Sequence, residues 1–266
     1  MSFATRSLKV GIRGLMLACG YDMVESDPLG TQEKVLLKLL SECSINCVVD
    51  VGAHRGEYGR YLRSFGYGGH IVSFEPVGSS FEALQQVSAQ DKRWRVYRLA
   101  LGATSSRNAS IGVAKSTSFS SFLEPNEAAF ERFGERPQTA RREVVEVRRL
   151  DEMLDEVTWG IDQPRLFMKI DTQGYDMRVL EGSQRVLSRF AGLQVELSSQ
   201  PIYRGMTPMS EAVVLLREAG FVAAGLYPIT RDAQLGVIEF DGLFVRKVLG
   251  SEAAMQLYNV AGKART

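Results

Sequence analysis

Two glycines and two acidic residues stand at spacings that could hold a nucleoside. The chain has 266 residues, and Gly52 and Gly56 follow the apolar run 47–51, which contains Asp50. Glu75 ends a second apolar run, 23 residues beyond Gly52. A glycine in such a turn lets backbone approach a ligand, and an acid at this distance commonly accepts both hydroxyls of a ribose. The pattern predicts a nucleoside site; the simpler alternative is a tight turn followed by a solvated glutamate.

The glycine loop lacks the residues that usually cradle a pyrophosphate. His54 stands where the dinucleotide fingerprint Gly-x-Gly-x-x-Gly has its second glycine, and no Walker A pattern occurs. A loop of this kind beside Asp50 suits a ligand that has no phosphate and carries an amino acid part. S-adenosylmethionine fits that description, so we expect it as the cofactor, with its ribose at Glu75. His54 is a weaker candidate base and more simply a loop residue that contacts the methionine carboxylate.

Three polar residues in later apolar runs could assist a transfer to a hydroxyl group. Asp171 follows the run 166–170, and Lys169 points to the same side of that strand. Glu196 stands near the end of a later run. A hydroxyl oxygen that attacks a methyl group must be held in line with the bond that breaks, and a base that takes the hydroxyl proton speeds the reaction. All three residues are therefore candidate catalytic residues. The simpler alternatives are a turn acid for Asp171 and an ion pair with Arg204 for Glu196.

Other classes of site find little support in the composition. Cys19, Cys43 and Cys47 form no C-x-x-C pair, and no cluster of His and carboxylates has metal-ligand spacing, so we expect no metal. Lys and Arg number 32 against 31 Asp and Glu, and this net charge of +1 disfavours nucleic acid as a partner. Free cysteines fit the reducing cytoplasm.

The N-terminal residues carry only a weak export or membrane signal. The apolar stretch 14–20 follows Arg13 and is far shorter than the roughly 20 residues of a membrane helix, so we expect no integral membrane segment. An amphipathic helix docked on the domain is the simplest interpretation. Weak peripheral contact of a basic helix with a membrane surface is the alternative.

These candidate residues need a parallel sheet to bring them together. The runs predicted as strands are 47–51, 70–74, 95–101, 144–150, 166–170, 192–197, 221–226 and 243–247. The segments predicted as helices are 33–40 with Thr31 as N-cap, the segment after Gly56, a segment capped by Ser79 or Ser80, 175–190 and 209–219. Alternating strands and helices indicate an α/β doubly wound sheet. Asp241-Gly242 would form a hairpin turn, or a turn into one final antiparallel strand.

The predicted domain covers residues 45–248. An N-terminal helical extension (1–44) precedes it, and a C-terminal tail (249–266) follows. Residues 102–148 interrupt the strand–helix rhythm and carry Ser118, Ser120, Ser121, Phe119 and Phe122. This insertion is either a lid that shapes an acceptor pocket and excludes water, or a surface loop.

Several motifs resemble the FkbM family of S-adenosylmethionine-dependent methyltransferases. VVDVGAHRGEYG (48–59) and IVSFEP (71–76) are similar to its opening motifs. LALG (99–102), RLDE (149–152) and KIDTQGYD (169–176) with VLEG (179–182) are similar to later ones. The family often has Glu where this chain has Gln173, so no carboxylate role carries over to that position.

The resemblance, from about residue 47 to 247, implies a Rossmann-like class I methyltransferase fold. This is a mostly parallel seven-stranded sheet flanked by helices, with an antiparallel last strand. We expect the cofactor to contact Asp50, Gly52, Ala53, His54, Gly56, Tyr58, Glu75, Pro76, Ala100, Leu101 and Asp171. The family's diverse substrates imply O-methylation of a sugar, glycan or other small-molecule natural product. Alternatives are methylation of nucleic acid or protein, a non-catalytic nucleoside-binding module, and an NAD-dependent oxidoreductase. The sequence gives no oligomeric state.

Overall fold

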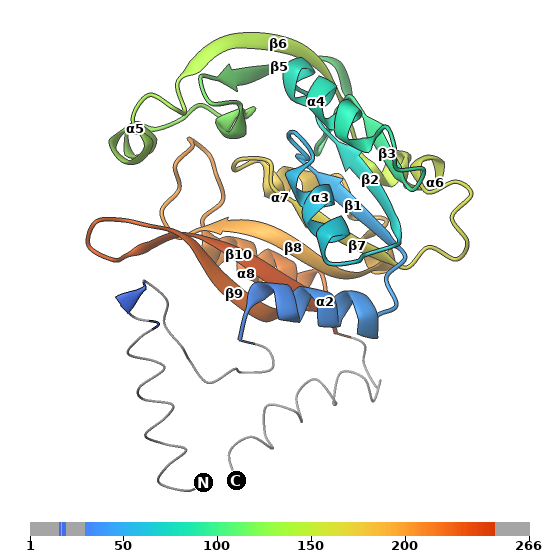
Figure 1. Cartoon of the computed structure of the whole chain (residues 1–266). Coiled ribbons are helices and arrows are strands. Elements are labelled where there is room, and N and C mark those ends of the chain that lie inside the picture. The colour runs from blue at the N-terminus through green and yellow to red at the C-terminus, as the bar shows by residue number, and fades with distance from the viewer. Residues whose placement is uncertain (1–15, 17, 20–29, 248–266) are drawn as a thin grey trace, which may run out of the picture.

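The structure is a computed structural model that describes residues 16, 18–19 and 30–247 (Figure 1). Most of the predicted extension 1–44 and the whole predicted tail 249–266 therefore lie outside the described residues. Among the residues described, no helix has the length and apolar character needed to cross a membrane.

A seven-stranded sheet forms the centre of the molecule, in the order β3-β2-β1-β7-β8-β10-β9. Its strands are β1 (Cys47–Val51), β2 (His70–Phe74), β3 (Trp94–Tyr97), β7 (Leu166–Ile170), β8 (Phe190–Ser198), β9 (Phe221–Arg231) and β10 (Val237–Arg246). β10 is antiparallel to both of its neighbours, and the remaining pairs are parallel. This confirms the predicted Rossmann-like fold, in which β10, the last of the described strands, is antiparallel and lies between β8 and β9.

Helices cover both faces of the sheet because alternate strand residues point to opposite sides. Val48 and Phe167 pack with α2 (Gln32–Glu42), α3 (Glu57–Ser64) and α4 (Gly78–Ser88) on one face. Val49 and Met168 pack with α6 (Leu154–Val157), α7 (Asp176–Glu181) and α8 (Met209–Glu218) on the other. Such burial on both faces is typical of parallel strands, and it makes the buried Asp50 and Lys169 exceptional.

The predicted insertion forms a second, three-stranded sheet in the order β4-β6-β5. Its elements are β4 (Ala100–Leu101), β5 (Ser106–Ala114), the 3-10 turn η1 (Thr117–Phe119), α5 (Glu127–Phe133) and β6 (Thr139–Arg148). Figure 1 shows this small sheet at the top of the molecule, on the side away from α2.

Two predicted elements are shorter than expected. The run 95–101 is divided between β3 in the main sheet and β4 in the small sheet. The helix predicted over 175–190 is only α7, which ends at Glu181 with Gly182 as its C-cap. A Cβ atom at Gly182 would lie 1.9 Å from the carbonyl oxygen of Gly102, so the backbone of the insertion crosses at this point.

Two of the predicted turn and cap positions were wrong, and one was correct. Asp241-Gly242 lies inside β10, and the hairpin turn is instead built around Asp232, whose Oδ1 accepts from the amides of residues 234 and 236. The helix α4 begins at Gly78 without a side-chain cap from Ser79 or Ser80. Thr31 is confirmed as the N-cap of α2, because its side chain accepts from the amide of Lys34.

Candidate active site

A cavity of about 810 Å³ lies where β1, β2 and β7 end. The predicted site residues that line it are Gly52, Ala53, His54, Tyr58, Glu75, Pro76, Ala100, Leu101, Lys169 and Asp171. Asp50, Gly56 and Glu196 are absent from the lining and stand behind it. The cavity thus lies at the carboxyl edge of the parallel strands, where open α/β sheets bind their ligands.

Gly52 is required by a close approach of two loops. Its φ is +78°, and a Cβ atom there would lie 1.9 Å from the carbonyl oxygen of Asp171. Gly56 has a φ of +83° and forms the N-cap of α3, where a Cβ would press against Leu84 and Trp94. Gly52 therefore shapes the cavity, whereas Gly56 serves the packing behind it.

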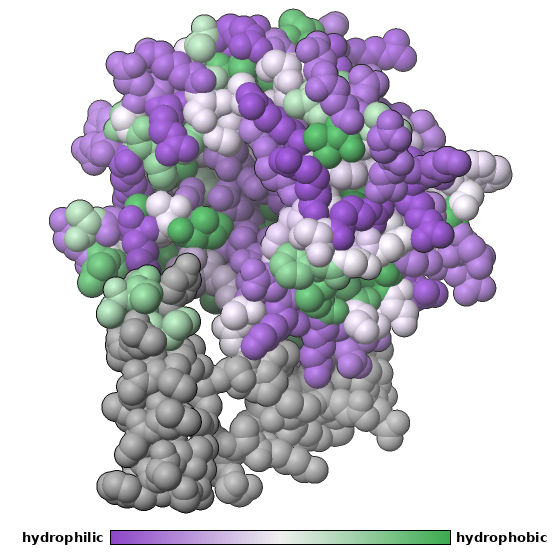
Figure 2. Space-filling model, viewed as in Figure 1, coloured by the Kyte–Doolittle hydropathy of each residue, from purple (hydrophilic) through white to green (hydrophobic). Residues whose placement is uncertain are grey.

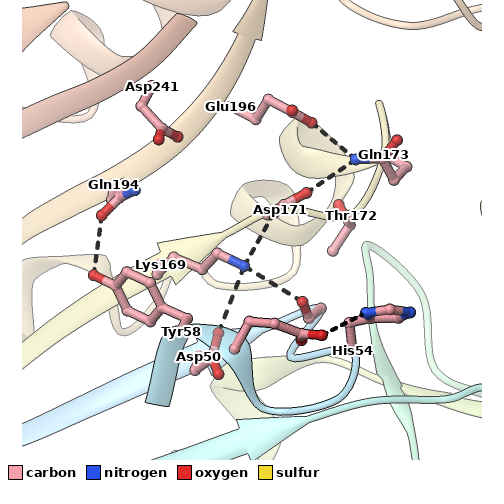
Figure 3. Close-up of polar contacts among 12 residues, drawn as sticks. Asp50, His54, Tyr58, Lys169, Asp171, Thr172, Gln173, Gln194, Glu196 and Asp241 are labelled. Carbon is pink, nitrogen blue, oxygen red and sulfur yellow. Dashed lines mark hydrogen bonds and ion pairs between the residues drawn. The ribbon is translucent and has the colours of Figure 1, made fainter. Parts of the chain in front are cut away.

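Lys169 joins three parts of the site through a buried ammonium group (Figure 3). Its Nζ lies 3.2 Å from Asp171 Oδ2, 3.7 Å from Asp50 Oδ1 and 3.4 Å from the carbonyl oxygen of Gly52. Burial alone would lower the pKa of Lys169, but the Asp171 and Asp50 carboxylates outweigh it and hold the pKa above its usual range. Asp50, which also accepts from Ser73 at 3.0 Å, is thus a counter-ion of Lys169 behind the cavity wall.

Glu75 fixes the backbone of two loops at the end of β2. Its Oε2 accepts from the amide of His54 at 2.9 Å, and its Oε1 accepts from the amide of Val77 at 2.8 Å. Burial raises the pKa of Glu75 to about 8, although these hydrogen bonds oppose the rise. A carboxylate has about four acceptor positions, so two remain for a ligand in the cavity.

Gln173 links the two predicted catalytic carboxylates. Its Nε2 lies 3.1 Å from Asp171 Oδ1 and 3.2 Å from Glu196 Oε2, while its Oε1 lies 3.1 Å from the hydroxyl of Tyr203. Because Tyr203 can donate to Oε1, the amide group presents its hydrogens to both carboxylates (Figure 3). Glu196 therefore pairs with Gln173, and no ion pair between Glu196 and Arg204 is found among the described residues.

The two carboxylates differ in their readiness to hold a proton. Burial alone would raise the pKa of Asp171, but Lys169 and the hydrogen bond from Gln173 outweigh it, so the pKa falls below its usual value. Burial raises the pKa of Glu196 well above its usual value, and the charge of Asp171 adds to this. Asp171 therefore favours the ionised form, whereas Glu196 holds a proton more readily than an ordinary glutamate does.

Asp176 performs the turn-stabilising role that was the simpler alternative for Asp171. Its two carboxylate oxygens accept from the amides of Thr172 and Gly174, each at 3.1 Å. Burial and then the charge of Asp171 raise the pKa of Asp176 to about 6. The Asp171 side chain, 38% exposed, is thereby left free to face the cavity.

Sequence reasoning missed one wall of the cavity. The missed lining residues include Gln32, Glu33, Tyr61, Gln194 and Asp241. They come from α2, α3, β8 and β10, far apart in the chain. Polar residues inside otherwise apolar strands were the available signal, but it does not say which strands become neighbours.

The insertion also contributes to the cavity. Its lining residues are Ile111, Thr117, Ser118, Ser120 and Phe122. The Oγ1 of Thr117 lies 2.8 Å from His54 Nε2, and the hydroxyl of Ser121 donates to the carbonyl of Gln173 at 2.7 Å. Figure 2 shows this face of the molecule hollowed beneath the small sheet, with much of the hollow's surface hydrophilic.

Within residues 30–247, no group of three or more His, Cys, Asp or Glu side chains could hold a metal ion.

Comparisons with known proteins found structural likenesses at low sequence identity. No curated protein matches the chain. An rRNA methylase from Streptococcus thermophilus is 12% identical, with 85% of this chain and 100% of the other covered and a TM-score of 0.44. The 1,6-didemethyltoxoflavin-N1-methyltransferase of Burkholderia thailandensis is 9% identical, with 80% and 77% covered and a TM-score of 0.45. The magnesium protoporphyrin IX methyltransferase of Synechocystis PCC 6803 is 10% identical, with 90% and 97% covered and a TM-score of 0.44.

The family comparison is more specific than these structural likenesses. The model of the methyltransferase FkbM domain matches residues 50–223, which include the glycine loop, Glu75 and Asp171. The matched range is more than half of the chain and contains the insertion as well as most of the cavity wall. The chain belongs to the FkbM family of methyltransferases.

Proposed function

We propose that the chain transfers a methyl group from S-adenosylmethionine to a hydroxyl oxygen of a sugar, glycan or other small molecule. Family membership supports methyl transfer. The observation that supports this cofactor is that Gly52, Glu75 and Asp171, from three strand ends, surround one cavity. Bound S-adenosylmethionine supplies an electrophilic methyl group on a sulfonium.

The residues around the glycine loop suit the cofactor. Gly52 leaves room for the cofactor to approach the backbone, and Glu75 retains free acceptor positions for the ribose hydroxyls. Ala100 and Leu101 offer an apolar surface against which the adenine ring can pack. The cavity volume of about 810 Å³ falls within the range of small-molecule sites. The loop has no second glycine for a pyrophosphate, which argues against a dinucleotide.

Asp171 is the residue we assign to the acceptor hydroxyl. It is ionised, faces the cavity and is held from two sides by Lys169 and Gln173. A carboxylate so placed accepts the hydroxyl's hydrogen bond and orients the oxygen for in-line attack. Because its pKa is low, Asp171 takes the proton only as the new C–O bond forms and the hydroxyl becomes acidic. Glu196 supports it through Gln173, whose Nε2 contacts both carboxylates.

Calorimetry with S-adenosylhomocysteine, the demethylated product of the cofactor, and with NAD tests the cofactor assignment. We expect binding of the former only, and weaker binding by Glu75→Ala because the ribose loses an acceptor. Failure of the folded protein to bind S-adenosylhomocysteine would refute the proposal. Transfer of a labelled methyl group to a panel of hydroxylated acceptors then separates a transferase from a nucleoside-binding module.

A further inference from the structure

Asp241 places a carboxylate in the cavity wall, and among the described residues no ion pair reaches it. It lies in β10 opposite Glu196 of β8 and lines the cavity. Its Oδ2 accepts from Gln32 Nε2 at 2.8 Å, and the Gln194 side chain is its second hydrogen-bond partner. In the part of the chain that the structure describes, the cation nearest the wall, Lys169, forms its ion pairs with other carboxylates and not with Asp241.

The neighbouring polar groups are oriented to favour a negative charge at this point. The hydroxyl of Tyr58 donates to Gln194 Oε1 at 3.0 Å, which turns the Gln194 amide nitrogen toward Asp241. Gln32 presents its amide nitrogen from α2. Burial raises the pKa of Asp241, whereas these two hydrogen bonds and the charge of Lys169 oppose the rise. Neutral donors stabilise a half-buried carboxylate only in part, and Lys169 forms its ion pairs with Asp50 and Asp171, so this wall can still accept a further positive charge.

Asp241 lies at the end of the cavity that is remote from Glu75. In Figure 3, Asp241 and Gln194 lie on one side of Lys169, and His54 lies on the other. The rings of Tyr58 and Tyr61 stack with centroids 6.2 Å apart and line the same end. The charge of Lys169 is already shared between Asp50 and Asp171.

The cavity as a whole is acidic. The lining carboxylates are Glu33, Glu57, Asp171 and Asp241, the lining lysine is Lys169, and Glu75 adds little to this balance because its pKa of about 8 keeps it mostly protonated at neutral pH. A single cationic cofactor balances only part of this charge. A phosphorylated or carboxylated acceptor would face repulsion here, whereas a cationic one would be attracted.

Resting on the proposed function, we propose that the acceptor carries an ammonium group near the hydroxyl that is methylated, and that Asp241 binds this ammonium. The acceptor class is an amino sugar or a similar amino polyol. Asp241 is then a specificity-determining residue, with Gln32 and Gln194 as the residues that position it. The stacked Tyr58 and Tyr61 rings provide a surface for the carbon face of such a ring.

The test compares D-glucosamine, N-acetyl-D-glucosamine and D-glucosamine 6-phosphate as probes on the complex with S-adenosylhomocysteine. Binding is followed by calorimetry and by the shift in melting temperature, at low salt and neutral pH. We expect the free amine to bind at least about tenfold more tightly than the acetylated form, as for a hydrogen bond to a charged group. The phosphate form should bind less tightly than the free amine.

Asp241→Asn should abolish the preference for the amine and leave the affinity for S-adenosylhomocysteine within about twofold. Glu218→Gln, which removes an exposed carboxylate on α8, is the matched control and should retain the preference. The comparison of the three sugars on the wild-type chain needs no variant, so a poorly folding Asp241→Asn does not block the test.

Two results would overturn the inference. One is equal or tighter binding of the neutral or phosphorylated sugar by the wild-type complex. The other is a large loss of S-adenosylhomocysteine affinity in Asp241→Asn, which would assign the carboxylate to the amino group of the cofactor. Both differ from failure of the proposed function, in which the wild-type chain does not bind S-adenosylhomocysteine at all.

Discussion

A buried carboxylate and a half-buried one face the cavity from opposite ends, and different groups hold them. At one end Glu75 accepts from two backbone amides, those of His54 and Val77. At the other end Asp241 is held by the side-chain amides of Gln32 and Gln194. We call these the loop end and the wall end. Backbone donors cannot turn away without moving a loop, whereas a glutamine can adopt another rotamer.

Because of this difference, we expect substitutions at the two ends to have different effects. A change at the loop end disturbs the backbone and therefore affects folding and cofactor binding together. A substitution at the wall end alters side-chain hydrogen bonds and should affect acceptor binding alone. The four predictions below test that division, beginning with the group that lies between the two ends.

Asp171→Asn should cause the largest loss. Removing the charge that receives the acceptor's proton should lower kcat by about 100-fold or more. Affinity for S-adenosylhomocysteine should stay within about threefold, because Gln173 and Lys169 still hold the side chain. Steady-state kinetics and calorimetry on the same preparation measure both. Full activity in this variant would remove Asp171 as the base.

Gly52→Ala should destabilise the fold far more than Gly66→Ala. Both residues have a positive φ, +78° and +81°, but only at Gly52 does a Cβ meet backbone, while nothing lies within 4 Å at Gly66. The left-handed conformation alone costs about 1 kcal/mol for alanine, and the overlap with Asp171 should add about 2 kcal/mol more. Urea unfolding measures the difference. Equal losses would mean that the two loops separate easily and that the loop end is not rigid.

The loop end should make cofactor binding depend on pH. With a folded pKa of about 8 and an ordinary value of 4.5, Glu75 keeps its proton while the unfolded chain loses it. Its contribution to the free energy of unfolding is therefore complete below about 4.5 and is lost as the pH rises to about 8. Ribose hydroxyls and a cationic cofactor favour the ionised form, so S-adenosylmethionine affinity should rise roughly tenfold between pH 7 and pH 9.

Glu75→Gln is the control for this pH effect and should give a nearly flat profile over the same range. Asp176, whose pKa is about 6, has completed most of its titration above pH 7 and does not confuse the measurement. An unchanged slope in Glu75→Gln would assign the effect to another group.

Gln32→Leu should have the smallest effect and a selective one. It removes one of the two donors to Asp241 at a half-buried site, at a cost of about 1 kcal/mol or less in unfolding free energy. Binding of D-glucosamine to the complex should weaken several-fold, and S-adenosylhomocysteine affinity should not change. A drop in cofactor affinity instead would show that the two ends are not independent.

The same division explains what could be predicted from the sequence. Gly52 and Glu75 belong to one strand–helix–strand unit, so their spacing along the chain already indicates their proximity. Gln32 and Asp241 are 209 positions apart and meet only because β10 inserts beside β8. The predicted boundary of one helix was wrong for a related reason. The helix α7 ends at Glu181, and the backbone of Gly102 lies against its C-cap Gly182, a contact that no helical periodicity contains.

The pairing of β4 with β6 has a consequence for how this molecule can change over generations. Ala100 pairs with Val147, so the chain leaves for the insertion and returns from it side by side. Segments can lengthen or shorten between two such fixed points at little entropic cost, and without shifting the register of the seven main strands. The insertion, which lines part of the cavity, can therefore change in length while the main sheet is inherited intact.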